Sequence, residues 1–140
     1  MKKAQAALEF LFVIGFAMLL LLPSLGLFAL FVQESSSTVT ANQVETIGNT
    51  FLNTATQVAA SGEGATLVVE VVFPDGVKSM GIQSNNELIF STSIGGVETT
   101  QVYYSSIPLQ GAFTANDISK GNKKFSFQLD ENGIVEIKKI

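Results

Sequence analysis

The sequence predicts an α+β protein in which a long N-terminal α-helix precedes a small antiparallel β-sheet or sandwich domain. Three observations predict this class. Residues 10–32 are an unbroken apolar run, residues 44–58 repeat apolar positions at helical spacing, and residues 65–137 hold short β-branched or alternating segments between turn signals. The first half of the helix is therefore expected to be apolar on every side, and the second half amphipathic.

The apolar run extends over 23 residues, from Phe10 to Val32, without a charge. About 20 apolar residues suffice to span a bilayer as a helix. The lysines that precede the run favour a cytoplasmic N-terminus, so we expect the rest of the chain to lie outside the cell. A secretory signal peptide, leaving a mature chain that starts near Leu27, and a plain membrane anchor are the alternatives. The carboxylate of Glu9, at the start of the run, counts against the signal peptide, since an ionised group is costly to bury there. In a plain anchor it could face the lipid headgroups.

Pro23 and Gly26 interrupt the apolar half of the helix. Pro23 lacks an amide proton and crowds the carbonyl of Leu19, so a kink or local melting is expected, although membrane helices commonly tolerate such kinks. Small residues such as Gly15 permit close helix approach. Five of the eleven phenylalanines also lie here and are expected to supply packing bulk in a helix bundle: Phe10, Phe12, Phe16, Phe28 and Phe31.

The amphipathic half is identified by apolar residues separated by steps of three or four. The stripe consists of Val44, Ile47, Phe51, Ala55 and Val58. The opposite face carries Asn42, Glu45, Asn49, Asn53 and Gln57, and Gly62 is suited to a helix C-terminus. We expect one helix over about residues 6–60, with residues 35–60 packing on the sheet.

The remaining residues, 61–140, read as a β-rich globular domain. Strands are expected at residues 65–73, 77–83, 87–93, 97–104, 125–129 and 134–137, and residues 105–124 are expected to form an exposed, variable loop. Of the adjacent Tyr103 and Tyr104, at most one can face the core, because neighbouring strand residues point to opposite sides.

Composition excludes several chemistries. The chain has 140 residues, no cysteine, no histidine and no arginine, and its net charge is −4. Disulfides, thiolate nucleophiles, Ser-His-Asp triads and imidazole metal sites are therefore absent, and an acidic chain is a poor nucleic-acid binder. Residues 130–133 are too short for a calcium loop and are expected to form a hairpin turn. We predict no enzymatic activity and no cofactor or metal.

The N-terminus reads Met-Lys-Lys-Ala-Gln-Ala-Ala-Leu-Glu-Phe before the apolar run. This start resembles the precursors of archaeal type IV pilins, in which a short basic leader ends in a small residue and the mature chain has Gln first and Glu fifth. Ala7 and Val13 stand where that family often has Ser and Leu. The resemblance covers roughly the first 30 residues.

By this resemblance, a prepilin peptidase removes residues 1–4, and Lys2, Lys3, Ala4 and Gln5 form the cleavage site. Gln5 becomes the mature N-terminus, and Glu9 neutralises the N-terminal amine of a neighbouring subunit during assembly. A carboxylate and an ammonium attract strongly in a low-dielectric bundle, where each alone is penalised. Residues 5–34 then form the membrane-embedded helix of the precursor and the core of the filament.

The resemblance implies a structural subunit of an archaeal adhesion pilus, a homo-oligomeric helical filament that attaches to cells or abiotic surfaces. The implied partners are the prepilin peptidase, an assembly ATPase and a membrane platform protein. The precursor is expected in the cell membrane and the mature protein in the extracellular filament. The alternatives are a minor pilin, a pseudopilin or an archaellum-like subunit, and a membrane-anchored extracellular β-domain that binds a ligand.

Overall fold

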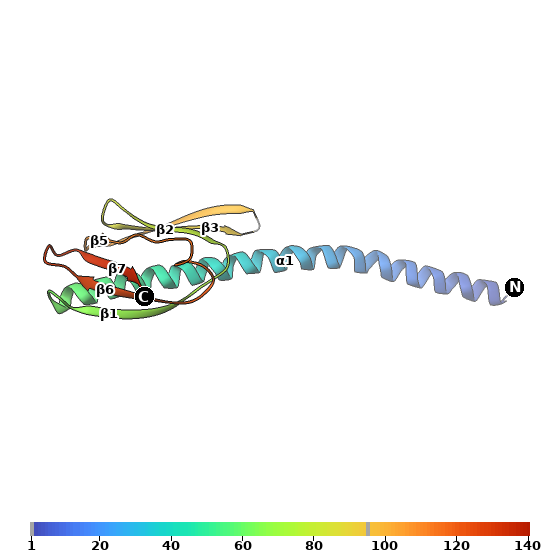
Figure 1. The fold of residues 1–140 in the computed structure, drawn as a ribbon. Coiled ribbons are helices and arrows are strands. Elements are labelled where there is room, and N and C mark those ends of the chain that lie inside the picture. Colours follow the sequence, from blue (N-terminus) through green and yellow to red (C-terminus); the bar gives the residue numbers. More distant parts are fainter. Residues whose placement is uncertain (1, 95) are drawn as a thin grey trace. The chain divides into compact units, whose positions relative to one another are not determined.

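The computed structural model describes the backbone of residues 2–94 and 96–140, and their side chains except those of residues 2–4, 33–37 and 94. The chain divides into two compact units, residues 1–36 and residues 37–140. One α-helix, α1 (Lys2–Ser61), contributes to both units, and all the strands belong to the second (Figure 1). The predicted α+β class, with a long N-terminal helix and a β-rich remainder, is confirmed.

The first unit is helical throughout its described length. Within it, the segment Gln5–Val32, 28 residues long, is long and apolar enough to cross a membrane. Pro23 lies inside α1, and the Ser24 hydroxyl donates a hydrogen bond to the Leu21 carbonyl at 2.8 Å. The backbone is helical on both sides of Pro23 and through Gly26. The local melting expected at these two residues is therefore not observed.

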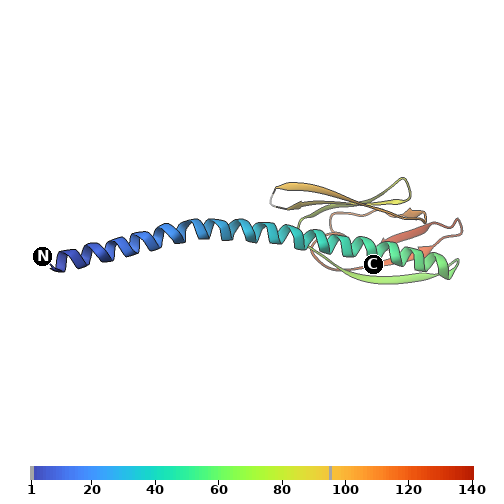
Figure 2. The same cartoon turned by 180° about the vertical axis from the view of Figure 1, so that it is seen from behind.

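The second unit contains seven strands in its described residues. They are β1 (Thr66–Phe73), β2 (Val77–Gln83), β3 (Glu87–Ile94), β4 (Val97–Tyr104), β5 (Leu109–Gln110), β6 (Gly121–Leu129) and β7 (Val135–Lys139). Strands β1, β6, β7 and β5 form one sheet in that order, and β2, β3 and β4 form the other. Figure 2 shows the same arrangement from behind. Each segment predicted as a strand is a strand, with ends that shift by a few residues.

Two details differ from the sequence prediction. The short strand β5 runs parallel to β7, so the four-stranded sheet is mixed rather than purely antiparallel. Residues 105–124 are not simply an exposed loop: they contain β5 and the first residues of β6, and Leu109 and Ile118 are buried. These two apolar residues lie in a stretch without helical or strand periodicity, so the local sequence did not predict their burial.

The core of the second unit forms where the amphipathic half of α1 packs on the β-strands. All five residues of the predicted stripe are at most 3% exposed. The ring of Phe51 makes edge contacts with Phe125 at 5.0 Å and with Phe127 at 5.1 Å between ring centres. Because β6 alternates, these two phenylalanines point to the same face of its sheet, toward the helix. The polar face that the sequence predicts is exposed.

The helix ends where the sequence indicates. Gly62 follows Ser61 with a φ of 94°, a left-handed conformation that glycine adopts without steric cost. The chain then reverses, and the amide of Ala65 donates to the Gly62 carbonyl at 3.1 Å. This turn brings β1 back beside the helix that precedes it.

Gly48 of α1 lies directly against the side chain of Tyr103 in β4. A Cβ atom at this position would lie 2.7 Å from the ring of Tyr103. That ring is held by a hydrogen bond from its hydroxyl to Gln101 at 2.7 Å and by an edge contact with Phe90 at 5.9 Å. Tyr104, by contrast, is 70% exposed, which confirms that only one of the two tyrosines packs on the core.

Replacing Gly48 by alanine is therefore expected to destabilise the second unit by about 1–3 kcal/mol, because the Tyr103 ring must leave its place to avoid the new methyl group. The measurement is the guanidinium midpoint of the detergent-solubilised chain, followed by near-ultraviolet circular dichroism. Gly26→Ala is the matched control, since a Cβ there meets no atom within 4 Å. Equal midpoints for the two variants would contradict the packing described.

Candidate assembly site

The helix surface of residues 10–32 is apolar on all sides. Every residue from Gln5 to Val32 is exposed, and the large side chains among them include Phe10 at 67% and Phe28 at 66%. A helix that is hydrophobic all round must be covered, by lipid or by other helices. An exposed apolar surface of this extent is typical of a segment that contacts lipid or other protein helices.

Glu9 is the only charged residue between positions 5 and 32. It lies four residues after Gln5, so the two side chains share one face of the helix. The residues that follow Glu9, from Phe10 to Val32, carry no charge. The carboxylate therefore stands at the boundary of the apolar surface, where burial in lipid or in a helix bundle would leave it in need of a positive partner.

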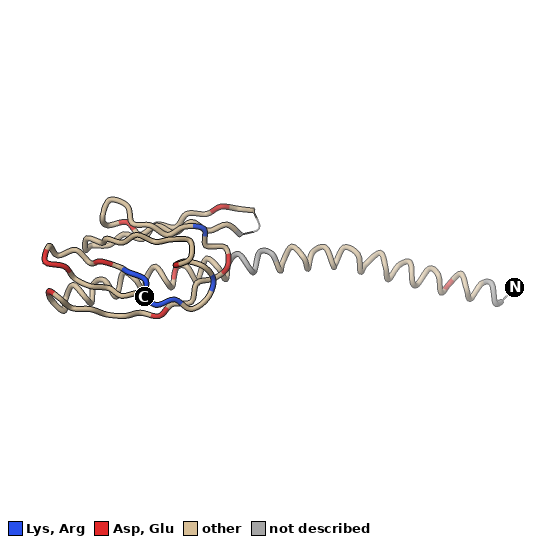
Figure 3. The backbone as a smooth tube through the Cα atoms, viewed as in Figure 1, with Lys and Arg blue, Asp and Glu red and all other residues tan. Residues whose placement is uncertain are grey.

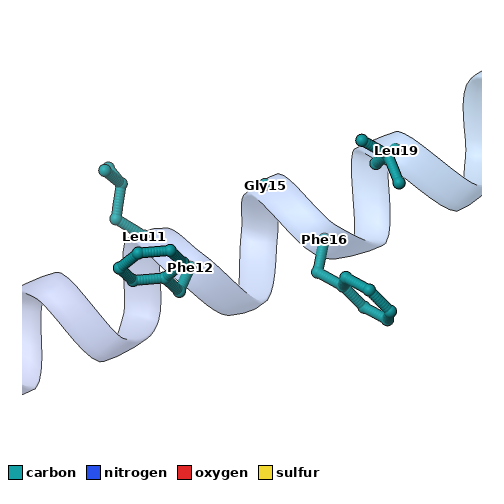
Figure 4. Close-up of a pocket in the computed structure, with 5 residues that line it drawn as sticks. All are labelled: Leu11, Phe12, Gly15, Phe16 and Leu19. Atoms are coloured by element: carbon teal, nitrogen blue, oxygen red, sulfur yellow. The ribbon is translucent and has the colours of Figure 1, made fainter.

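Two of the five phenylalanines in this unit line a shallow hollow on the helix surface. Its lining residues are Leu11, Phe12, Gly15, Phe16 and Leu19, and Gly15 contributes no side chain (Figure 4). A Cβ at Gly15 would meet no atom within 4 Å. The leucines were not singled out from the sequence, although their positions four residues before and after a glycine are the pattern that creates such a hollow. Phe10, Phe28 and Phe31 lie elsewhere on the helix and are exposed.

The predicted cleavage residues are largely beyond what the structure describes. The side chains of Lys2, Lys3 and Ala4 lie outside the described residues, and Gln5, the first with a described side chain, is exposed. Gly26 offers open space around its Cα, as Gly15 does. The structure thus places Gln5 and Glu9 on one helix face.

The acidic turn at residues 130–133 forms the hairpin that the sequence predicts. Asp130 accepts hydrogen bonds from the backbone amides of Asn132 at 2.9 Å and of Ile134 at 2.7 Å, and Gly133 has a φ of 77°. The carboxylate is therefore engaged by the turn itself. Among the described residues, no three acidic side chains gather closely enough to hold a metal ion.

These hydrogen bonds predict a pH dependence. The backbone amide of Ile134, followed by the Asn132 side chain and amide, lowers the pKa of Asp130 although desolvation opposes it. A lowered folded-state pKa gives stability that is present above the unfolded value of about 3.9 and is lost as the pH falls through the folded value. We expect the second unit to lose stability below about pH 4, and Asp130→Ala to flatten that loss. Guanidinium midpoints from pH 7 to pH 2.5 test this. Identical slopes for both chains would contradict it.

A scan against protein-family models finds no matching family, and searches of curated proteins and of solved structures find no match. The functional assignment therefore depends on the residues and geometry of this chain.

Proposed function

We propose that this protein is the structural subunit of an archaeal type IV-like adhesion pilus. The observation that carries the proposal is an apolar α-helix of 28 residues, exposed on every side, with a single carboxylate at its beginning. Such a helix has two ways to cover its surface, in a bilayer and in a bundle of identical helices. A pilin uses both in turn, as a membrane-bound precursor and as a filament subunit.

Cleavage between Ala4 and Gln5 would place a free α-amino group on the helix face that carries Glu9. In a filament, the Glu9 carboxylate of one subunit pairs with the Gln5 ammonium of its neighbour. The pairing is strong because both groups are surrounded by apolar side chains, and it favours one helix register over non-specific aggregation. This pairing requires removal of residues 1–4. In the precursor the nitrogen of Gln5 belongs to a peptide bond and carries no positive charge.

The second unit becomes the surface of the filament in this proposal. It has its own core, so it can remain folded while the first unit passes from lipid to filament. It meets cells or abiotic surfaces, and the prepilin peptidase, assembly ATPase and platform protein act on the chain during biogenesis. The motor energy is attributed to that machinery.

The test is the intact mass and N-terminal sequence of the protein isolated from its native cells, together with electron microscopy of sheared filaments. A mature chain that starts at Gln5 and is recovered in filaments is expected. An intact Met1 would instead indicate a permanent membrane anchor, and a start near Leu27 a secretory signal peptide. The protein could also be recovered in filaments without which cells lose swimming but still attach. That result would favour an archaellum-like subunit.

A further inference from the structure

The lysines of the second unit are concentrated at one end of the four-stranded sheet. Five of its six lysines lie just before β6, in its first residues, or at the end of β7: Lys120, Lys123, Lys124, Lys138 and Lys139. Figure 3 shows the lysine-bearing segments gathered near the C-terminus. We call this group the basic end.

The register of β6 and β7 explains why the basic end presents charge on both sides of the sheet. Phe125 is opposite Lys139, and Ser126 is opposite Lys138. Side chains alternate along a strand, so Lys123 is the diagonal neighbour of Lys139 on one face, and Lys124 is the diagonal neighbour of Lys138 on the other. Lys120 immediately precedes β6, so the positive charge surrounds the end of the strand pair.

Three carboxylates interact with these lysines. Lys124 lies 3.8 Å from Glu70, and Lys138 lies 2.7 Å from Glu136. Hydrogen bonds from Thr114 lower the pKa of Asp117, and nearby Lys139 and Lys123 lower it further. Five lysines thus outnumber three carboxylates. Asp75, in the turn that follows β1, and Lys78, in the next strand β2, add one charge of each sign, so the surplus at the basic end is positive.

The opposite end of the same sheet is acidic. Asp130 and Glu131 follow β6, and Glu63 precedes β1. The two turns are adjacent, because the Gly64 amide donates to the Leu129 carbonyl at 3.3 Å. No lysine occurs in residues 61–67 or 127–136, and Glu63 and Glu131 are exposed. We call Glu63, Asp130 and Glu131 the acidic end.

The two ends are too far apart to neutralise each other within one copy. Lys124 and Asp130 are six positions apart along nearly continuous strand, which corresponds to about 20 Å. The Debye length at physiological ionic strength is about 8 Å, so their mutual attraction is largely screened. The exposed Glu63 and Glu131 of the acidic end, and the surplus positive charge of the basic end, are therefore available for contact with another molecule.

We propose that the basic end of one copy binds the acidic end of a second copy, head to tail, in the assembled filament. This inference rests on the proposed function. The charge complementarity lies within a single chain, so the partner that it fits is another copy of that chain. A contact between two different surfaces of the same protein is heterologous, and it builds an open helical array when the rotation between successive copies does not close a ring. Opposite charges also guide approach and fix register between surfaces.

The test uses charge reversal and charge exchange in the full chain. Lys139→Glu and Glu131→Lys are each expected to lower the fraction of subunit recovered in sheared filaments about five-fold, because each replaces an attraction by a repulsion. The variant that combines both changes restores opposite charges across the contact and should recover most of the wild-type fraction. The measurement is quantitative blotting of the filament and membrane fractions.

The control has the same net charge as the exchange variant but places the new lysine elsewhere. Lys139→Glu with Glu98→Lys adds a lysine at β4, outside the acidic end, and should not restore assembly. Equal recovery in this control and in the exchange variant would overturn the proposal, as would normal filaments from either single reversal. If the Lys139→Glu variant assembles normally but its filaments adhere less to a polyanionic surface, the basic end binds that surface and not a second copy of the chain. Absence of filaments from the wild-type chain would refute the proposed function rather than this contact.

Discussion

A fragment that begins at Gly62 is expected not to fold, whereas a fragment that begins at Ser37 folds cooperatively. The shorter fragment keeps all seven strands but loses the stripe of α1 that covers them. Phe51, fully buried between Phe125 and Phe127, is the largest residue of that stripe. Removing a buried phenylalanine side chain alone costs about 3–5 kcal/mol. Four further buried residues are lost with it, so the deficit is comparable to the roughly 5–15 kcal/mol by which a domain is normally stable.

Circular dichroism and amide hydrogen exchange of the two fragments measure this difference. The fragment from Ser37 is expected to show a single unfolding transition and slow exchange in β6, and the fragment from Gly62 to show neither. The two differ only in residues 37–61, which makes the longer fragment the matched control. A cooperative transition in the shorter fragment would mean that the two sheets form a core without the helix.

Replacing Glu9 by valine is expected to leave leader cleavage intact and to reduce filament assembly by about a hundred-fold or more. The substitution leaves the Gln5 ammonium of a neighbouring subunit without its carboxylate in an apolar bundle. Leaving one partner of a buried ion pair uncompensated costs about 3–5 kcal/mol, and each 1.4 kcal/mol is a factor of ten in association.

The measurement compares the N-terminal sequence of the variant with its recovery in sheared filaments. Glu98→Val is the control, because it removes a carboxylate by the same substitution at an exposed position of β4. Normal filaments from the Glu9 variant would remove this residue from the assembly mechanism. Failure of cleavage would instead move its role to recognition by the peptidase.

The sequence was sufficient to predict the helix and the strands because both have local periodicities. The steps of three and four between Val44 and Val58 specify one helix face, and all five residues on it are buried. The alternation of Phe125, Phe127 and Leu129 specifies one face of β6, and all three are buried as well. A residue's neighbours within a few positions determine such patterns, so they can be read without knowledge of the fold.

Only part of the candidate assembly site could be predicted from the sequence. The apolar run, Gln5 and Glu9 are contiguous in sequence, so their arrangement on a helix follows from helix geometry alone. The hollow around Gly15 also follows from spacing, although Leu11 and Leu19 were recognised only in the structure. The pairing of Glu9 with a neighbour's amino group involves a second molecule, which neither the sequence nor a single chain contains.

By itself, then, the sequence determined the α+β class, the apolar character of the first unit and the face by which α1 packs on the strands. Tertiary structure alone decided that β5 pairs in parallel with β7, that Leu109 and Ile118 are buried, and that lysines from two separate segments meet at one end of a sheet. The physical reason is that these features depend on pairings between residues distant in sequence. The register of one strand against another fixes which side chains become neighbours, and that register is a property of the folded chain as a whole.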